Sequence, residues 1–240
     1  MITNEQSGTR IDEIADRIFR INTPLEIPGG AFSFNQYLVV DDSPLLFHTG
    51  PRRLFGLVKE AVAAVVDPAT LRYISFSHVE SDECGSLNEW LAAAPNAEPL
   101  CSTVAAIVSV TDLADRAPRA LADNETLSLG RRTVRWLDTP HLPHGWETGY
   151  LFEETTRTLF CGDLLTQPGR GDDAVTESDI LGPSEAFRAS MDYYSATKNG
   201  PALIAKVAAT NPTTLACMHG SAWSGDGAAL LAELGRQLDR

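Results

Sequence analysis

The chain has 240 residues, of which 43% are hydrophobic and 21% charged, and its mean hydropathy is −0.10. These values are typical of a folded globular protein and exclude a chain that is disordered throughout. Its 32 acidic residues outnumber its 19 basic residues, which gives a net charge of −13. Because nucleic acids and anionic membranes both attract cationic surfaces, this charge argues against either partner.

The N-terminal segment is polar and mixed in charge, without the basic and apolar stretches of a secretory signal. No apolar run approaches the roughly 18 residues that a membrane-spanning helix needs. The four cysteines are scattered and form no Cys-x-x-Cys pair; they are Cys84, Cys101, Cys161 and Cys217. We therefore expect a cytoplasmic protein with free thiols.

The first half of the chain is predicted to mix short strands with helices. β-Branched and aromatic residues favour strands, and apolar residues at helical spacing favour helices. In chain order we expect strands at 16–22, 34–40 and 45–48, a helix at 52–66, a strand at 71–76, a helix at 87–94, a strand at 99–102 and a short helix at 103–110.

The second half begins with hairpins and ends with helices. We expect strands at 125–129, 133–137, 149–152 and 158–160, a surface loop at 167–183, helices at 184–197 and 201–209, a strand at 213–218 and a helix at 227–238. This order indicates a layered α/β or α+β fold. No linker divides the sequence, so we expect one domain over 1–240.

Metal-binding residue types follow four of the predicted strands directly. The junctions are SHVESDE at 77–83, PHLPHGW at 140–146, CGDLL at 161–165 and MHGSAW at 218–223. Binding sites in layered α/β proteins tend to lie beyond the carboxyl ends of strands. Four of the five histidines fall in these junctions, and the fifth, His48, also ends a strand. Strand ends therefore point to a site without proving ligation.

The densest junction holds His78, Glu80, Asp82 and Glu83 within six residues. In an extended loop, alternation would send His78, Glu80 and Asp82 to one side. Asp82 and Glu83 alone fit an acidic helix N-terminus, but that reading leaves His78 and Glu80 unexplained. The segment therefore predicts a metal site.

The other junctions each supply one candidate ligand. Asp163 follows an apolar strand, where a buried carboxylate needs a partner or a cation, although a turn-capping role is the alternative. His144 competes with His141 in the same loop, and His219 could also be a hydrogen-bonded core histidine. We expect a structural or orienting role for His48 and a supporting or surface role for His141.

The order His-x-Glu-x-Asp, His, Asp, His resembles the metallo-β-lactamase-fold superfamily. Glu80 stands where the zinc pattern of that superfamily has a second histidine, and glutamate there resembles the flavodiiron and oxygen-binding di-iron branch. The resemblance implies an α+β fold, an αββα four-layer sandwich with the metal site between its sheets. It assigns one iron to His78, Glu80 and His144, the other to Asp82 and His219, and a bridging role to Asp163.

Position 83 departs from that branch, which has a histidine there. Glu83 either ligates the second iron or turns away from it. The proposed set of three histidines and four carboxylates suits iron or manganese, whereas zinc prefers histidine and cysteine. Four carboxylates also balance the charge of two divalent ions. We therefore expect two irons, with manganese or zinc as competitors.

The resemblance implies an oxidoreductase that binds O2 or NO and reduces it when electrons arrive, or an oxygen sensor when they do not. Flavodiiron enzymes bind FMN in a following flavodoxin-like domain, but this chain ends at Arg240 and shows no convincing phosphate loop. We therefore expect no FMN on this chain and a separate electron donor, and a homodimer stays open. The alternative is a dinuclear metal-dependent hydrolase of a thioester, lactam or phosphodiester, which Glu80 disfavours.

Three aromatic residues could wall the pocket or belong to the core: Trp146, Tyr150 and Trp223.

Overall fold

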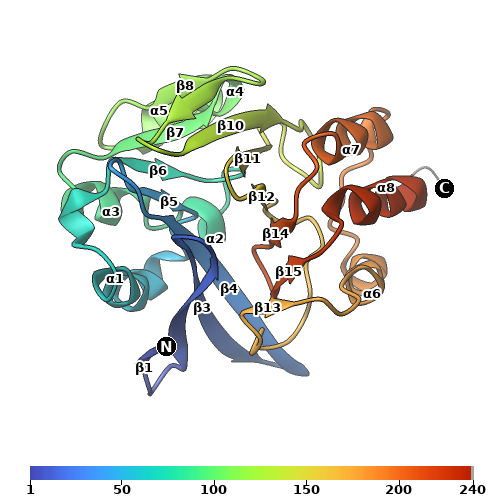
Figure 1. The fold of residues 1–240 in the computed structure, drawn as a ribbon, viewed down its shortest axis with the longest axis horizontal. Helices are drawn as coiled ribbons and strands as arrows, with labels where there is room; N and C mark the ends of the chain where they lie inside the picture. The colour runs from blue at the N-terminus through green and yellow to red at the C-terminus, as the bar shows by residue number, and fades with distance from the viewer. Residues whose placement is uncertain (239–240) are drawn as a thin grey trace.

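Two mixed β-sheets pack face to face in the computed structural model, which describes residues 1–238 (Figure 1). The first sheet has the order β1-β2-β3-β4-β5-β6-β7-β8. Its strands are β1 (Ile2–Asn4), β2 (Thr9–Ala15), β3 (Ile18–Ile27), β4 (Gly30–Val39), β5 (Leu45–Phe47), β6 (Tyr73–Ser75), β7 (Glu98–Ser102) and β8 (Arg119–Leu121). Strands β1 to β5 pair antiparallel, and β5 to β8 pair parallel.

The second sheet has the order β13-β15-β14-β12-β11-β10-β9. Its strands are β9 (Thr126–Ser128), β10 (Thr133–Asp138), β11 (Gly149–Glu153), β12 (Thr158–Phe160), β13 (Val175–Thr176), β14 (Thr214–Ala216) and β15 (Ala222–Ser224). Strands β12 and β14 are parallel neighbours, with Phe160 opposite Ala216. Their carboxyl ends therefore lie at the same edge of the sheet.

Helices cover the outer faces of both sheets (Figure 1). The first half has α1 (Phe55–Ala63), α2 (Ser81–Cys84), α3 (Leu87–Ala93), α4 (Thr103–Ala105), a π-helical turn (Ala106–Val110), α5 (Thr111–Leu113) and 3₁₀ turns at Arg52–Leu54 and Pro68–Thr70. The second half has α6 (Leu181–Met191), α7 (Gly200–Ala208) and α8 (Gly227–Leu238). No helix within residues 1–238 combines the length and apolar character needed to cross a membrane.

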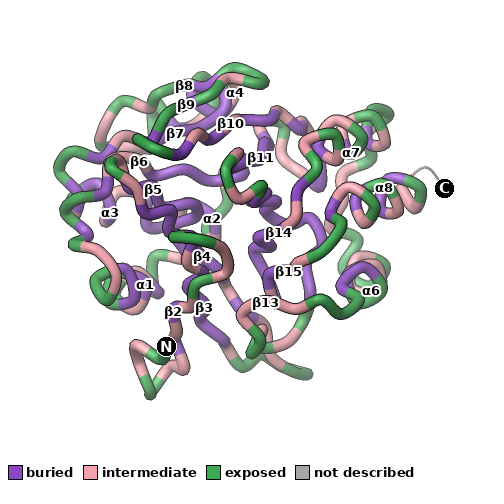
Figure 2. Tube along the Cα trace, viewed as in Figure 1, coloured by how far each residue is buried: buried purple, intermediate pink, exposed green. Residues whose placement is uncertain are grey.

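Three apolar clusters hold these layers together. Strand alternation divides β4, since Leu38 packs outward with the α1 and α3 residues, whereas Tyr37 and Val39 point between the sheets. On the other side, Leu231 of α8 and Ile204 of α7 pack on the outer face of the second sheet. The central strands are accordingly buried along most of their length (Figure 2). The result is the four-layer αββα sandwich expected from the sequence.

Several predicted elements differ from those observed. The predicted helix 184–197 is instead Leu181–Met191, because Asp192 takes a left-handed conformation with φ 50° and ends it. The predicted loop 167–183 contains β13, and strands β1, β2, β8 and β15 were not predicted. The predicted extended run through Asp82 is also wrong, because Ser81–Cys84 form the helical turn α2.

Candidate metal centre

The seven predicted ligands converge at one edge of the sandwich, beyond the ends of four strands. The segment after β6 carries four of them, and the ends of β10, β12 and β14 lead to the others. Helix α2, which holds Asp82 and Glu83, lies near the centre of the view in Figure 1. A helical turn brings these consecutive carboxylates to one site, whereas an extended chain would send them to opposite sides.

One group of ligand atoms is built around His78 and His144. Their Nε2 atoms are 3.0 Å apart, and Glu80 Oε1 lies 3.2 Å from His144 Nε2 and 3.9 Å from His78 Nε2. Asp163 Oδ2 lies 3.4 Å from His144 Nε2 and 3.7 Å from His78 Nε2. Two imidazole nitrogens and two carboxylate oxygens thus face one another.

The second group is built around His219. Its Nε2 lies 3.2 Å from Asp163 Oδ1 and 3.5 Å from Asp82 Oδ2. Ligand atoms of Asp82, Glu83 and His219 lie within 4.8 Å of one another. Glu83 Oε2 is also 3.8 Å from His78 Nε2, so this carboxylate borders both groups. Asp163 presents Oδ2 to the first group and Oδ1 to the second.

Each histidine is oriented by a hydrogen bond on its far nitrogen. His144 Nδ1 lies 2.9 Å from the Tyr193 carbonyl oxygen, and His219 Nδ1 lies 2.8 Å from the Ser33 carbonyl oxygen. Because a carbonyl only accepts, both Nδ1 atoms carry the proton and direct Nε2 into the site. His78 Nδ1 has the Ser77 hydroxyl 3.0 Å away.

The donor set fits a bound cation. Glu83 is fully buried, and neither of its carboxylate oxygens has a hydrogen-bond partner within residues 1–238. Burial, reinforced by the Asp163 and Asp82 charges, raises its pKa well above the usual value. A carboxylate in such a place is costly unless a proton or a metal ion neutralises it. Glu83 therefore points inward, toward the other candidate ligands, and its ligation of a metal stays a prediction.

Two histidines of the site hold a proton more strongly than a free imidazole does. Burial alone would lower the pKa of His219, but its hydrogen bond to Asp163 raises it; a hydrogen bond to Glu80 likewise raises the pKa of His144 against the effect of burial. Metal binding must displace such protons. The affinity of this site for metal should therefore increase as the pH rises.

His48 lies behind the site rather than in it. Its Nε2 is 3.0 Å from the Ser77 hydroxyl, which in turn contacts His78 Nδ1. His48 is fully buried, and burial lowers its pKa from 6.5 to about 3. His48 thus belongs to a hydrogen-bonded chain, His48–Ser77–His78, that ends on a candidate ligand. His141 is exposed and lies outside the clustered residues.

For the three aromatic residues a pocket wall and a core position were both open, and the structure places Tyr150 in the core. Tyr150 belongs to the outer core of the second sheet and donates to the Leu142 carbonyl, Trp223 donates to Ser178, and Trp146 is 58% exposed. Other rings lie beside the candidate ligands and were not predicted. Between centroids, Phe32 lies 4.3 Å and Phe34 5.4 Å from the His219 ring, and Tyr193 lies 6.1 Å from the His144 ring.

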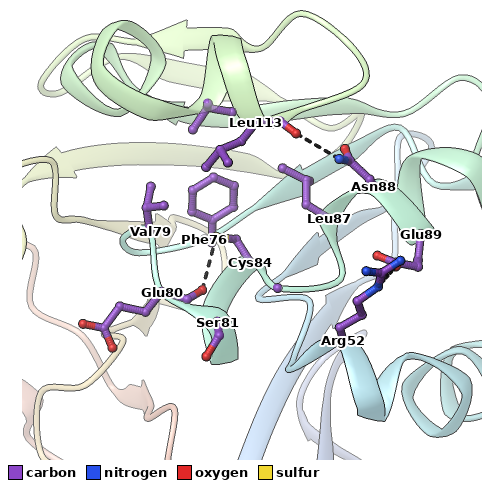
Figure 3. A pocket seen from close by; sticks show the side chains of 12 residues that line it. Arg52, Phe76, Val79, Glu80, Ser81, Cys84, Leu87, Asn88, Glu89 and Leu113 are labelled. Atoms are coloured by element: carbon purple, nitrogen blue, oxygen red, sulfur yellow. Dashed lines mark hydrogen bonds and ion pairs between the residues drawn. The ribbon is translucent and has the colours of Figure 1, made fainter.

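An apolar pocket of about 400 Å³ lies behind the segment that carries Glu80. Its lining includes Phe76, Val79, Cys84 and Leu87, and the Glu80 carboxylate points away from them (Figure 3). The Cys84 thiol donates to the Glu80 carbonyl oxygen, which holds the start of α2. Glu80 is itself one of the lining residues, so the pocket borders the cluster of ligand atoms at this segment.

Most of the chain matches one protein family. The model of the family described as "ODP family beta lactamase" matches residues 32–220, which include all seven clustered side chains. The chain belongs to this family.

Relatives of this ODP-family chain include flavodiiron proteins. A rubredoxin-oxygen oxidoreductase from Megalodesulfovibrio gigas is 28% identical over 167 residues, which cover 68% of this chain and 40% of the relative. An anaerobic nitric oxide reductase flavorubredoxin from Pectobacterium atrosepticum is 27% identical over 169 residues, which cover 68% of this chain and 32% of the relative. The match therefore spans about a third to two fifths of these relatives.

Solved structures show the same fold. A metal-soaked flavodiiron core from Synechocystis superposes with a TM-score of 0.81 at 21% identity, covering 96% of this chain and 60% of that one. A fragment of a diflavin flavoprotein from Nostoc gives a TM-score of 0.79 at 16% identity and covers 96% of both chains. The metallo-β-lactamase fold predicted from the sequence is therefore confirmed.

Proposed function

We propose that this chain is a di-iron domain that binds O2 or NO and reduces it when electrons are supplied. The observation that carries the proposal is the pair of ligand groups joined by Asp163, with buried Glu83 between them. The names of two relatives, an oxygen oxidoreductase and a nitric oxide reductase, indicate the same chemistry in those proteins.

His78, Glu80 and His144 would hold one iron, Asp82, Glu83 and His219 the other, and Asp163 would contact both. Four carboxylates among seven donors favour iron or manganese over zinc. When bound, a di-iron pair supplies electrons and open positions for a small diatomic ligand. This set also disfavours the hydrolase alternative, because Glu80 replaces a neutral imidazole at the first metal.

The protein's own residues position the reaction. The Tyr193 and Ser33 carbonyls fix two imidazoles, and the buried sheet ends keep bulk water from Asp163, which is 7% exposed. Glu80 has a half-exposed side chain at the rim, and its hydrogen bond to His144 lowers its pKa. Solvent therefore reaches the edge of the site beside His144.

We further propose that electrons come from a separate redox protein. The name of the Megalodesulfovibrio gigas relative indicates rubredoxin as the donor of that protein. A chain that binds the gas without receiving electrons would act as a sensor. Steady-state gas consumption in the presence of a reduced donor separates these two modes.

The decisive experiment is anaerobic purification, metal quantification, and exposure to O2 and NO while the visible spectrum is recorded. We expect two irons per chain and a gas-dependent spectral change. Asp163→Asn should lose both, whereas the exposed control Asp115→Asn should behave like the wild type. Zinc alone with a silent spectrum, and turnover of a thioester, lactam or phosphodiester, would favour the hydrolase instead.

A further inference from the structure

Two buried thiols face each other directly behind the metal centre. Cys161 follows β12 and Cys217 follows β14, and these strands are parallel neighbours paired through Phe160 and Ala216. The two Sγ atoms are 3.8 Å apart, and both residues are fully buried in the outer core of the second sheet. Neighbouring strands lie about 4.8 Å apart, which is within the Cα separation of about 4.4–6.8 Å that a disulfide spans.

We propose that Cys161 and Cys217 form a reversible disulfide when the protein meets a peroxide. One thiol sulfur attacks a peroxide oxygen, which gives a sulfenic acid and one water. The second thiol sulfur displaces the sulfenic hydroxyl, which leaves as a second water when it takes up the thiol proton. Two thiols and one hydrogen peroxide thus give one disulfide and two waters, with two electrons passing from sulfur to oxygen.

The surroundings of the pair favour a small oxidant. Cys161 donates a hydrogen bond to Cys217, so the two sulfurs already lie against each other. Both residues are 0% exposed within the described chain, which keeps bulky disulfides and alkylating agents away from the sulfurs. Hydrogen peroxide is close to water in size and is the oxidant that such a site admits.

The disulfide would act on the metal centre through the backbone. Asp163 lies two residues after Cys161, and His219 lies two residues after Cys217. Bond formation requires the sulfurs to approach by about 1.7 Å, from the 3.8 Å observed to about 2.05 Å. This movement pulls together the two strand ends that carry the bridging carboxylate and the histidine beside it. We therefore expect the oxidised chain to take up less metal than the reduced chain.

The test uses the full chain, freed of metal with a chelator so that iron cannot react with the peroxide. The reduced protein is treated with hydrogen peroxide, denatured, alkylated and examined by mass spectrometry. We expect a lighter product that carries two alkyl groups instead of four and has lost a further 2 Da, with Cys161 and Cys217 in one cross-linked peptide pair that dithiothreitol separates. Zinc uptake of the two forms then measures the effect on the site.

Matched variants make the result specific. Cys161→Ser should abolish the lighter product, whereas Cys84→Ser should keep it. Peptide mapping of the wild type needs no variant and decides the question even if Cys161→Ser fails to fold. Four intact thiols after treatment, oxidation confined to Cys84, or a lighter product in Cys161→Ser would overturn the proposal. Equal zinc uptake by the two forms would overturn its link to the metal centre.

Discussion

The buried His48 predicts a measurable acid sensitivity of the metal-free protein. Burial lowers its pKa from 6.5 to about 3 in the folded state. Between these values the unfolded chain takes up a proton that the folded chain refuses, so stability is lost as the pH falls below 6.5. At pH 5 the loss is about 2 kcal/mol relative to pH 7, because each pH unit between the two pKa values costs about 1.4 kcal/mol.

His48→Gln removes this titration and keeps a polar partner for the Ser77 hydroxyl. The difference in unfolding free energy between pH 7 and pH 5 should therefore be smaller in the variant, by about 2 kcal/mol. Urea unfolding in the presence of a chelator, followed by tryptophan fluorescence, measures it. The exposed His141→Gln is the matched control and should retain the wild-type difference. Equal pH dependence in wild type and His48→Gln would refute the burial argument.

Three further variants test other parts of the structure. Glu83→Gln should bind one metal ion fewer than the wild type, because it keeps the size but removes the charge of a buried carboxylate without a hydrogen-bond partner. Metal analysis, with the exposed Glu177→Gln as the control, measures this. Full metal occupancy in Glu83→Gln would show that Glu83 is not a ligand. Arg20→Met should destabilise the protein by about 3 kcal/mol in urea denaturation, because the buried guanidinium donates to Asn35 and to the carbonyls of Gly171 and Gly220. The control Arg10→Met breaks a partly exposed ion pair with Asp12 and should cost less than about 1 kcal/mol. Similar losses of stability in the two variants would contradict this reasoning. Gly149→Ala should cost about 1–3 kcal/mol, because its Cβ would lie 2.3 Å from the Trp136 ring; an unchanged melting temperature would show that the ring moves aside freely.

The convergence of the candidate ligands could be predicted because their positions depend on strand ends, and buried strands leave clear apolar runs in the sequence. The strands before His78, Asp163 and His219 were all predicted, although 71–76 and 213–218 overran β6 and β14 by two residues or fewer at each end. Once strands are placed, parallel pairing brings their carboxyl ends together. The family resemblance indicated which residues at these strand ends are candidate ligands, and the fold brings those residues together.

Other features could not be predicted, for physical reasons. Helix α2 is a single turn of four residues, too short to show helical periodicity, so the inward direction of Glu83 was left open. The Ser33 and Tyr193 groups that orient two histidines are backbone carbonyls, which any residue would supply. Helix α6 ends at Asp192, which takes a left-handed conformation. Aspartate is not the glycine that usually marks such a helix end in a sequence. Metal binding by the seven candidate ligands, and their assignment to particular irons, stay predictions.

The ligand groups are divided between the two halves of the molecule. His78, Glu80, Asp82 and Glu83 follow a strand of the first sheet, whereas His144, Asp163 and His219 follow strands of the second. Between the sheets, Phe160 packs against Tyr37 and Phe47. A bound metal pair would hold the two sheets in register, and its affinity would report how well they are aligned. Phe160→Leu is a conservative change at a residue that cannot bind metal. We would expect its first measurable effect to be a loss of bound metal.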